Sequence, residues 1–246
     1  MSNYIPKVIY MCHEKLDDIK IYSKNWQILN PEFQIKLYDD DLCREFFKKE
    51  FPNQPHLQIF DFIPDGPIKA DFWRVCVLFK YGGYYVDADI QPILPLRKFI
   101  EKDDVFICCT GNNTNGWFWK VSVNPHFLAA PKGHFILRKT ISKYLKLWQK
   151  KNNYSYWRWS IVRVLRTPYK PNRKFRPIFY KKEKHKFIVE RTNKEECEYK
   201  GEVVFRNRYP SYENHNFKPV ENIKTVSIHE NTNDIFDSTE YFSWKT

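Results

Sequence analysis

The stretch from Ile68 to Pro92, IKADFWRVCVLFKYGGYYVDADIQP, most constrains what this chain can fold into. Residues 69–81 repeat apolar side chains at helical spacing and contain no proline, which predicts a helix with an apolar stripe. Gly82-Gly83 then supplies residues that tolerate positive φ, which typically end a helix. The aromatic and β-branched residues that follow predict a short strand. A helix, a glycine stop and a strand therefore lead directly to Asp87 and Asp89.

The acidic pair has the chemistry of a divalent-metal site. At positions i and i+2 of an extended strand, Asp87 and Asp89 are expected to face the same side, toward one cation or a diphosphate. Asp71 and Arg74 share a face of the preceding helix, which also presents Lys69. Two plainer interpretations stay open, because a DxD triplet also occurs on solvated turns and an Asp–Arg pair is a common helix-surface ion pair.

Composition narrows the class of protein. The 246 residues carry a net charge of +12, which predicts an anionic partner. The seven glycines form neither GxGxxG nor GxxxxGK[ST], which removes the main support for dinucleotide-binding and P-loop folds. The six cysteines form no CxxC and several lie in apolar runs, so reduced, buried thiols are expected, with Cys108 and Cys109 as inert core. With neither signal-peptide architecture nor a membrane-spanning run, a cytoplasmic protein is predicted, with peripheral membrane association as an option.

Alternating strand and helix patterns predict one α/β domain over residues 1–246, with a mixed, mostly parallel sheet flanked by helices. The acidic run 39–41 is interpreted as a helix start. Expected strands are 5–11, 33–38, 84–86, 105–110, one or two within 117–130, a hairpin over 187–205, and 225–228. Expected helices are 16–29, 41–51, 69–81 and 135–150, with a proline-rich loop over 52–67.

The chain changes composition after residue 138. From Arg138 to Lys186 there are seventeen Lys and Arg residues and a single acid, Glu183. We expect a basic insertion lobe within 139–224, which could attract an acidic acceptor or hold the protein on an anionic membrane. The alternative is a nucleic-acid-binding module in which Trp157 and other aromatics stack on bases, but no RRM, KH, zinc or helix-turn-helix signature accompanies it.

Several blocks together resemble glycosyltransferase family 32, which includes yeast initiating mannosyltransferases, capsular polysaccharide glycosyltransferases and clostridial glucosylating toxins. The run KADFWRVCVLFKYGGYYVDAD resembles the family's DxD sugar-binding region. IPKVIYMCHEK resembles its first strand, and NWQILNPEFQIKLYDDDLCREFF resembles its Trp…Asn-Pro block. FLAAPKGHFIL and the ending His229…Ser243-Trp244 resemble later blocks, whereas 139–224 is not covered.

The resemblance implies a GT-A type fold and a retaining, metal-dependent hexosyltransferase. The implied cofactor is Mn²⁺ or Mg²⁺, and the implied donor is a nucleotide sugar, with a UDP-sugar favoured over GDP-mannose. The acceptor would be a glycan, a lipid-linked molecule or a protein hydroxyl, with nucleic acid not expected as a partner. A metal-dependent phosphodiesterase is a further alternative, although it would usually use more Asp and His ligands.

The resemblance also assigns roles to residues. Asp71 would bind donor sugar hydroxyls, Arg74 the sugar or diphosphate, and Asp87 the ribose and sugar beside the metal that Asp89 coordinates. The remaining assignments are Ile9 and Tyr10 near the base at the end of the first strand, Asn124 beside the sugar, His229 as a metal or diphosphate ligand, and Trp244 closing over the diphosphate. Two departures from the family pattern are Ala70 in place of a common Ser, and a wide spacing between His229 and Ser243.

Overall fold

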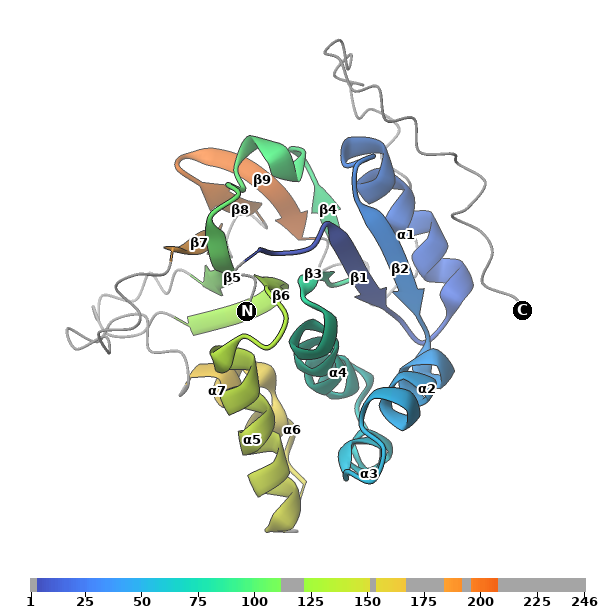
Figure 1. Cartoon of the computed structure of the whole chain (residues 1–246). Coiled ribbons are helices and arrows are strands. Elements are labelled where there is room, and N and C mark those ends of the chain that lie inside the picture. The colour runs from blue at the N-terminus through green and yellow to red at the C-terminus, as the bar shows by residue number, and fades with distance from the viewer. Residues whose placement is uncertain (1–3, 112–121, 151–153, 167–183, 192–195, 208–246) are drawn as a thin grey trace, which may run out of the picture.

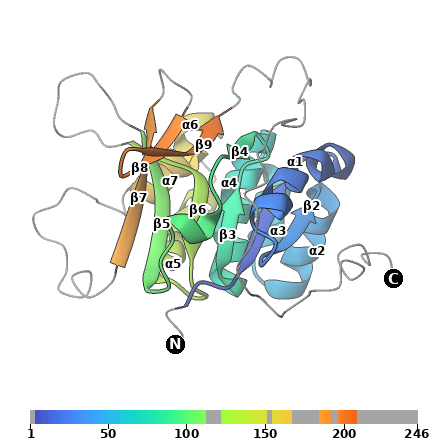
Figure 2. The ribbon, with the colours of Figure 1, turned by 90° about the horizontal axis from the view of Figure 1, so that it is seen from above.

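A computed structural model of the chain describes residues 4–111, 122–150, 154–166, 184–191 and 196–207. A curled sheet forms the centre and helices cover both of its faces (Figures 1 and 2). The strands are β1 (Val8–Cys12), β2 (Gln34–Tyr38), β3 (Gly83–Val86), β4 (Ile90–Pro92), β5 (Asp104–Gly111), β6 (Ser122–Ala130), β7 (Lys184–Arg191), β8 (Glu196–Tyr199) and β9 (Glu202–Asn207). The helices are α1 (Leu16–Leu29), α2 (Asp40–Glu50), α3 (His56–Phe62), α4 (Gly66–Tyr81), α5 (Phe135–Gln149), α6 (Tyr156–Trp159) and α7 (Ile161–Arg166), with a 3₁₀ turn at Leu96–Lys98.

The sheet order is β2-β1-β3-β6-β5-β7-β8-β9-β4. Among these described strands, three neighbouring pairs are parallel and five are antiparallel. The predicted α/β class and mixed sheet are confirmed, but the prediction of a mostly parallel sheet is wrong. Helical patterns flank the strands early in the chain, whereas β7, β8 and β9 follow one another with short connections and pair antiparallel.

Two apolar clusters hold the layers together. One lies between the sheet and helices α2 to α7, where Phe72 and Trp73 of α4 are completely buried. The other lies on the opposite face, where Trp26 of α1 packs on Phe127 and Phe205. Burial on both faces explains why the central strands read as continuous apolar runs. The segment formed by α4 and β3 therefore lies at the centre of the molecule.

Most elements agree with the sequence predictions, and the bounds of α1 agree to the residue. The predicted loop over 52–67 is wrong, because α3 occupies its middle and buries His56, Ile59 and Phe60. The prolines of that stretch flank the helix rather than interrupt it. The hairpin expected over 187–205 is part of a three-stranded unit, β7 to β9. The strand predicted at 225–228 lies outside the described residues.

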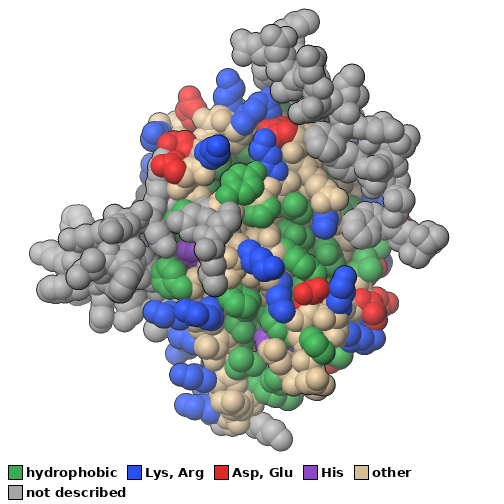
Figure 3. Space-filling view, viewed as in Figure 1, with side chains coloured by type: hydrophobic (Ala, Val, Ile, Leu, Met, Phe, Trp, Pro, Cys, Tyr) green, Lys and Arg blue, Asp and Glu red, His purple; other side chains and the backbone are tan. Residues whose placement is uncertain are grey.

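The basic stretch contributes to the same layered body. Helix α5 packs along α4, α7 packs on β6, and β7 extends the sheet beside β5. Lys and Arg side chains gather at the edge of the molecule near α5 (Figure 3). The described part of 139–224 thus gives no support for a separate insertion lobe. Within the described ranges, no helix has the length and apolar character that crossing a bilayer requires.

Candidate functional site

The turn between α4 and β3 fixes where the acidic pair lies. Helix α4 ends at Gly82, whose φ is 71° and whose N–H donates to the Leu78 carbonyl at 2.8 Å. A Cβ on Gly82 would lie 2.7 Å from the Lys132 nitrogen, and one on Gly83 would lie 2.7 Å from the Val8 carbonyl oxygen. Only glycine fits both the backbone conformation and this close approach. The pair therefore lets β3 enter the sheet between β1 and β6.

Arg74 is the centre of the site. Its guanidinium lies 3.0 Å from Asp71 Oδ1 and 2.9 Å from Asp87 Oδ1, and it donates to the Pro125 carbonyl at 2.7 Å. Its side chain is only 5% exposed. Burial lowers the pKa of Arg74, but the nearby Asp87, Tyr85 and Asp71 reverse this and hold that pKa well above its usual value. The structure thus brings two predicted site residues, Asp71 and Asp87, together around the permanently charged Arg74.

Tyr85 supports this group from the sheet. The Arg74 guanidinium carbon lies 4.3 Å from the centre of the Tyr85 ring, within cation–π range. The Tyr85 hydroxyl donates to Asp87 Oδ1 at 2.8 Å, and Cys12 Sγ lies 3.5 Å from the same hydroxyl. Tyr85 therefore orients both the cation and one carboxylate. The sequence offered no signal for this role, because Tyr85 reads as an ordinary strand aromatic.

Asp71 links the site to the α6–α7 segment. Its Oδ2 accepts from the backbone N–H of Ile161 at 2.9 Å. Burial raises the pKa of Asp71 to about 6, although Arg74 and the Ile161 N–H act in the opposite direction. This carboxylate is thus held in place on two sides, by α4's own arginine and by the start of α7. The bond to Ile161 was not predictable, because ninety positions separate the partners.

Asp87 and Asp89 lie on a tight turn, not on an extended strand as predicted. Strand β3 ends at Val86, and the Ile90 N–H donates to the Asp87 carbonyl at 3.2 Å, which closes the turn. The two carboxyl groups are nevertheless close enough to interact. Burial and the charge of Asp87 raise the pKa of Asp89 to about 7. A divalent cation would relieve this repulsion, so the residues present fit a hard metal ion with oxygen ligands.

The oxygens of the two aspartates are engaged differently. Asp87 Oδ1 accepts from Tyr85 and is paired with Arg74, and Asp87 Oδ2 lies 3.4 Å from Arg74 Nη1. Asp89 is partly exposed, and its strongest charged neighbour is Asp87. Asp89 is accordingly the better placed of the two to contribute an oxygen to a cation.

The other predicted site residues are more dispersed. Ile9 and Tyr10 are buried inside β1, which continues to Cys12, so they do not lie at the strand end as predicted. Asn124 donates to Glu190 at 2.7 Å. Lys69 pairs with Asp40 at 3.1 Å and not with the acidic pair of the turn. His229 and Trp244 lie outside the described residues.

Strand β6 supplies contacts that the sequence reasoning missed. The carbonyl of Pro125 accepts from Arg74, and the carbonyl of His126 accepts from the Asp87 N–H at 2.8 Å. Both are backbone acceptors, which leave no mark in residue identity. The β6 segment therefore fixes the positions of Arg74 and Asp87 from the side opposite α4.

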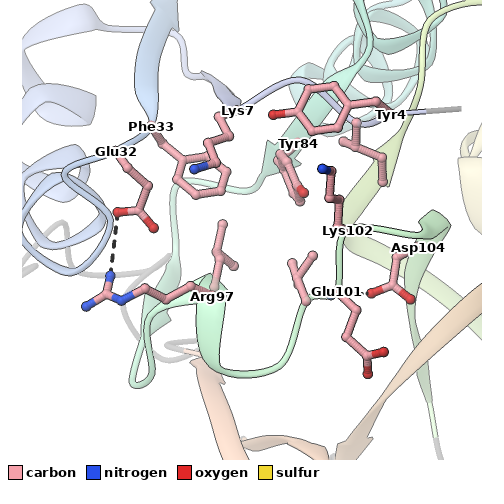
Figure 4. Close-up of a pocket in the computed structure, with 12 residues that line it drawn as sticks. Tyr4, Lys7, Glu32, Phe33, Tyr84, Arg97, Glu101, Lys102 and Asp104 are labelled. Atoms are coloured by element: carbon pink, nitrogen blue, oxygen red, sulfur yellow. Dashed lines mark hydrogen bonds and ion pairs between the residues drawn. The ribbon is translucent and has the colours of Figure 1, made fainter. Parts of the chain in front are cut away.

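A cavity at the other end of β1 and β3 is separate from this site (Figure 4). It has a volume of about 420 Å³, and Tyr4, Phe33, Tyr84 and Arg97 are among its lining residues. Arg97 pairs there with Glu32 at 3.5 Å. Neither the Arg74 network nor the acidic turn lines this cavity, so its size does not mark it as the place of the chemistry.

Comparison with known proteins identifies the region that carries this geometry. Residues 17–106 match the family described as the glycosyltransferase sugar-binding region containing the DXD motif. The initiation-specific alpha-1,6-mannosyltransferase of Candida albicans is 22% identical over 140 residues, which cover 50% of this chain and 36% of that protein. The mannosyl phosphorylinositol ceramide synthase of Saccharomyces cerevisiae is 28% identical over 154 residues, which cover 58% of this chain and 36% of that protein.

The fold also has a counterpart among solved structures. The PaToxG glycosyltransferase superposes with a TM-score of 0.52 over 67% of this chain and 69% of that one, at 15% identity. This likeness confirms the predicted GT-A type of α/β fold. The match to each of the two yeast proteins spans 36% of that relative's length, about a third.

Proposed function

Residues 17–106 belong to the family of glycosyltransferase sugar-binding regions with a DXD motif, and from this premise we propose that the protein is a hexosyltransferase. It transfers a sugar from a nucleotide-sugar donor to a hydroxyl group of an acceptor. One observation carries the proposal: a buried guanidinium, Arg74, is held by Asp71 and Asp87 beside Asp89 within that region. Ionisable groups that converge in this way and have shifted pKa values are typical of sites where charge develops during a reaction.

Asp89 is proposed as the main metal ligand, with Asp87 beside it. A bound Mn²⁺ or Mg²⁺ would neutralise the departing nucleoside diphosphate as a Lewis acid. Because Asp87 is tied to Arg74 and Tyr85, its position is set before any ligand arrives. Among the described residues, no side chain anchors Asp89 in this way, and its carboxylate is available to a cation at the partly exposed turn.

Arg74 is proposed to stabilise negative charge on the donor. Its two carboxylate partners and the Pro125 carbonyl fix the guanidinium plane, so little reorganisation is needed when charge develops on the diphosphate. A planar fork can contact two oxygens at once, which an ammonium cannot. The low local dielectric of this buried position strengthens the interaction.

Asp71 is proposed to accept hydrogen bonds from hydroxyls of the donor sugar. It is buried, and its two oxygens already contact Arg74 and the Ile161 N–H, so its geometry is predetermined. Each carboxylate oxygen can accept more than one hydrogen bond. Positioning of this kind places the anomeric carbon near the incoming acceptor hydroxyl.

A retaining outcome is part of the proposal and follows from the family resemblance. In a front-face transfer the acceptor hydroxyl approaches on the side of the leaving diphosphate, and a diphosphate oxygen takes its proton. This route requires no separate general base among the protein's residues. Ile9, Tyr10, Asn124, His229 and Trp244 keep their predicted donor-side roles as proposals.

The donor is proposed to be a UDP-sugar, with a mannosyl donor as the competing choice. The UDP preference comes from the family resemblance, whereas the Candida albicans relative is named as a mannosyltransferase. The acceptor is proposed to be a glycan, a lipid-linked molecule or a protein. The exposed lysines and arginine of α5 suit an acidic acceptor or the cytoplasmic face of an anionic membrane.

A donor panel tests the proposal directly. The full chain is incubated with Mn²⁺ or Mg²⁺ and with UDP-glucose, UDP-N-acetylglucosamine, UDP-galactose or GDP-mannose, without acceptor, and the released nucleotide is identified. We expect slow, metal-dependent release of nucleoside diphosphate from one donor. Release of nucleoside monophosphate would indicate a phosphodiesterase instead. No donor turnover together with tight, salt-sensitive oligonucleotide binding would favour a nucleic-acid-binding module.

A further inference from the structure

A second cluster of metal-binding side chains lies within the sheet, outside the donor site. It consists of Cys109 on β5, His126 on β6 and Cys197 on β8, with one ligand atom of each within 4.8 Å of the others. All three side chains are buried. Cys thiolates and His imidazoles are among the ligands that bind zinc in proteins.

The distances suit a shared cation. Cys197 Sγ lies 3.3 Å from His126 Nε2. In tetrahedral zinc sites, with Zn–S of about 2.3 Å and Zn–N of about 2.0–2.1 Å, neighbouring ligand atoms lie roughly 3.5–3.8 Å apart. Small side-chain movements would therefore bring the three atoms to ligand spacing. A disulfide between Cys109 and Cys197 is less suited, because β7 lies between their strands and would hold the two backbones apart.

The strand registers explain why these side chains meet. Cys109 pairs with Ile188 and Cys197 pairs with Glu190, and Ile188 and Glu190 lie on the same face of β7. Both thiols therefore point to that face. His126 reaches them because β6 bulges there. The β5–β6 register moves from Cys108 against Leu128 to Thr110 against Val123, which leaves extra β6 residues in between.

The surroundings of the cluster are mostly apolar but include one carboxylate. Ile107, Phe127 and Phe205 belong to the same buried cluster as the two thiols. Glu190 is 4% exposed, accepts from Asn124 at 2.7 Å, and interacts electrostatically with both His126 and Cys197. Burying so many polar groups in an apolar layer is costly unless they are paired or coordinate a metal.

We propose that Cys109, His126 and Cys197 bind one structural zinc ion, with Glu190 in the fourth position. Binding requires both thiols to be deprotonated and the imidazole to be neutral, and the thiol protons pass to solvent.

The zinc ion would stabilise the part of β6 that contacts the donor site. His126 contributes its imidazole to the cluster, while its carbonyl accepts from the Asp87 N–H, and the adjacent Pro125 carbonyl accepts from Arg74. Fixing the β6 bulge therefore fixes two contacts of the Arg74 network. This consequence for activity rests on the proposed function, whereas zinc binding itself does not.

Metal analysis and cobalt substitution test the binding. The full chain, purified without chelator, is expected to hold about one zinc per molecule, and the apoprotein to take up about one Co²⁺ with sulfur-to-cobalt charge-transfer absorption. Cobalt bound by Asp87 and Asp89 would give no such band, because no thiolate is among the proposed ligands there. The readout therefore separates the two metal sites without any activity measurement.

Cys197→Ala and Cys109→Ala are the test variants, and Cys108→Ala is the matched control. Cys108 is equally buried on β5 but belongs to the cluster on the other face of the sheet. We expect zinc content to fall at least about tenfold in the test variants and to stay at wild-type level in the control. If a test variant does not fold, the cobalt spectrum of the wild-type protein still shows whether thiolates bind the metal.

The proposal is overturned if folded wild-type protein with titratable, reduced thiols holds no zinc and shows no sulfur-to-cobalt band. It is also overturned if mass spectrometry finds Cys109 and Cys197 joined in a disulfide in the active protein. A zinc-binding protein without donor turnover would contradict the proposed transferase function alone. Donor turnover in wild-type protein that holds no zinc when purified without chelator would contradict the zinc site alone.

Discussion

Helix α4 contacts two regions with buried titratable groups, and these regions treat charge in opposite ways. At the site, Arg74 and its partners Asp71 and Asp87 form close ion pairs. In the aromatic layer beneath α2 and α3, His56 is 1% exposed, and neither ring nitrogen has a hydrogen-bond partner among the described residues. Its ring stacks on Phe51 at 3.9 Å and lies 5.9 Å from Phe72 of α4.

The difference separates packing from chemistry. Burial, followed by repulsion from Lys80, lowers the pKa of His56 to about 4, so this imidazole behaves as a neutral aromatic ring. The Arg74 network instead keeps its charges in a place where desolvation costs several kcal/mol per ion in order of magnitude. An apolar replacement would often serve stability as well or better. Charge retained at that cost indicates a functional demand on the Arg74 region that the His56 region does not have.

Asp89→Asn should give the largest effect. The amide keeps the shape of the side chain but removes the charge that would hold the cation, so turnover of the donor should fall by about a thousandfold or more. Unfolding stability should stay equal or rise slightly, because the repulsion from Asp87 disappears. Asp41→Asn is the control, since Asp41 is 89% exposed and its one ion pair among the described residues is a helix-surface bridge to Arg44. Full activity of Asp89→Asn, with and without chelator, would remove Asp89 from the metal site.

Arg74→Lys comes next in expected effect. An ammonium cannot hold Asp71, Asp87 and the Pro125 carbonyl at once, so kcat/KM should fall by about a hundredfold or more, with measurable loss of stability. Arg97→Lys is the matched control at the opposite end of the sheet. Arg97 is 41% exposed and pairs with Glu32, so this change should leave both kinetics and unfolding near wild type. Equal effects of the two substitutions would show that Arg74 has no greater role in the reaction than Arg97.

The sequence predicted the elements around the site better than its contacts. Apolar periodicity and Gly82-Gly83 located α4 and β3 because those signals are local. The turn at Asp87 to Asp89 was misjudged as an extended strand, since a hydrogen bond from Ile90 decides it and no residue type there demands it. The prediction of a mostly parallel sheet was wrong for a related reason, because strand direction depends on how segments far apart in the sequence pair.

The partners of the predicted residues were beyond local reasoning. The Ile161 N–H on Asp71 and the Pro125 carbonyl on Arg74 are backbone groups far along the chain. Tyr85 looked like a strand-forming aromatic, and its hydroxyl bond to Asp87 required the fold to be known. Cys109 read as inert core, because its neighbours His126 and Cys197 meet it only through the β6 bulge and the strand order.

Acid titration tests whether His56 is a neutral packing group, as the comparison with the Arg74 network requires. The unfolded chain protonates His56 near its ordinary pKa of 6.5, whereas the folded protein resists until about 4. Stability from this group is therefore present above pH 6.5 and is lost as pH falls toward 4, by up to about 3 kcal/mol. His56→Phe should stack equally well and remove that part of the acid sensitivity. Denaturant unfolding at pH 7 and pH 4.5 measures both proteins.

The matched control for this titration is His13→Gln, on the partly exposed segment after β1. It should leave the acid dependence of unfolding as in the wild type. If His56→Phe loses as much stability on acidification as the wild-type protein, the imidazole is not the source. In that case His56 would not be the neutral packing group that we contrast with the charged Arg74 network.

The smallest effect is expected at the exposed aromatics beside the network. Trp157 on α6 is 69% exposed, and its ring centre lies 5.3 Å from that of Tyr156, which interacts electrostatically with Asp71, Arg74 and Asp87. Since α7, which follows α6 directly, is bonded to Asp71, we expect this indole to lie near the proposed donor sugar. Unlike the ring of His56, this ring is mostly exposed, which suits stacking on an acceptor.

Trp157→Ala should therefore raise the acceptor KM by about two- to tenfold while leaving donor hydrolysis and unfolding unchanged. The control Leu42→Ala removes another exposed apolar side chain, on α2, and should change neither parameter. The measurement uses the acceptor found after the donor panel, with hydrolysis and transfer followed in the same reaction. A drop in donor hydrolysis equal to the drop in transfer would place Trp157 on the donor side. In that case Trp157 would act on the donor together with Arg74 and would not contact the acceptor.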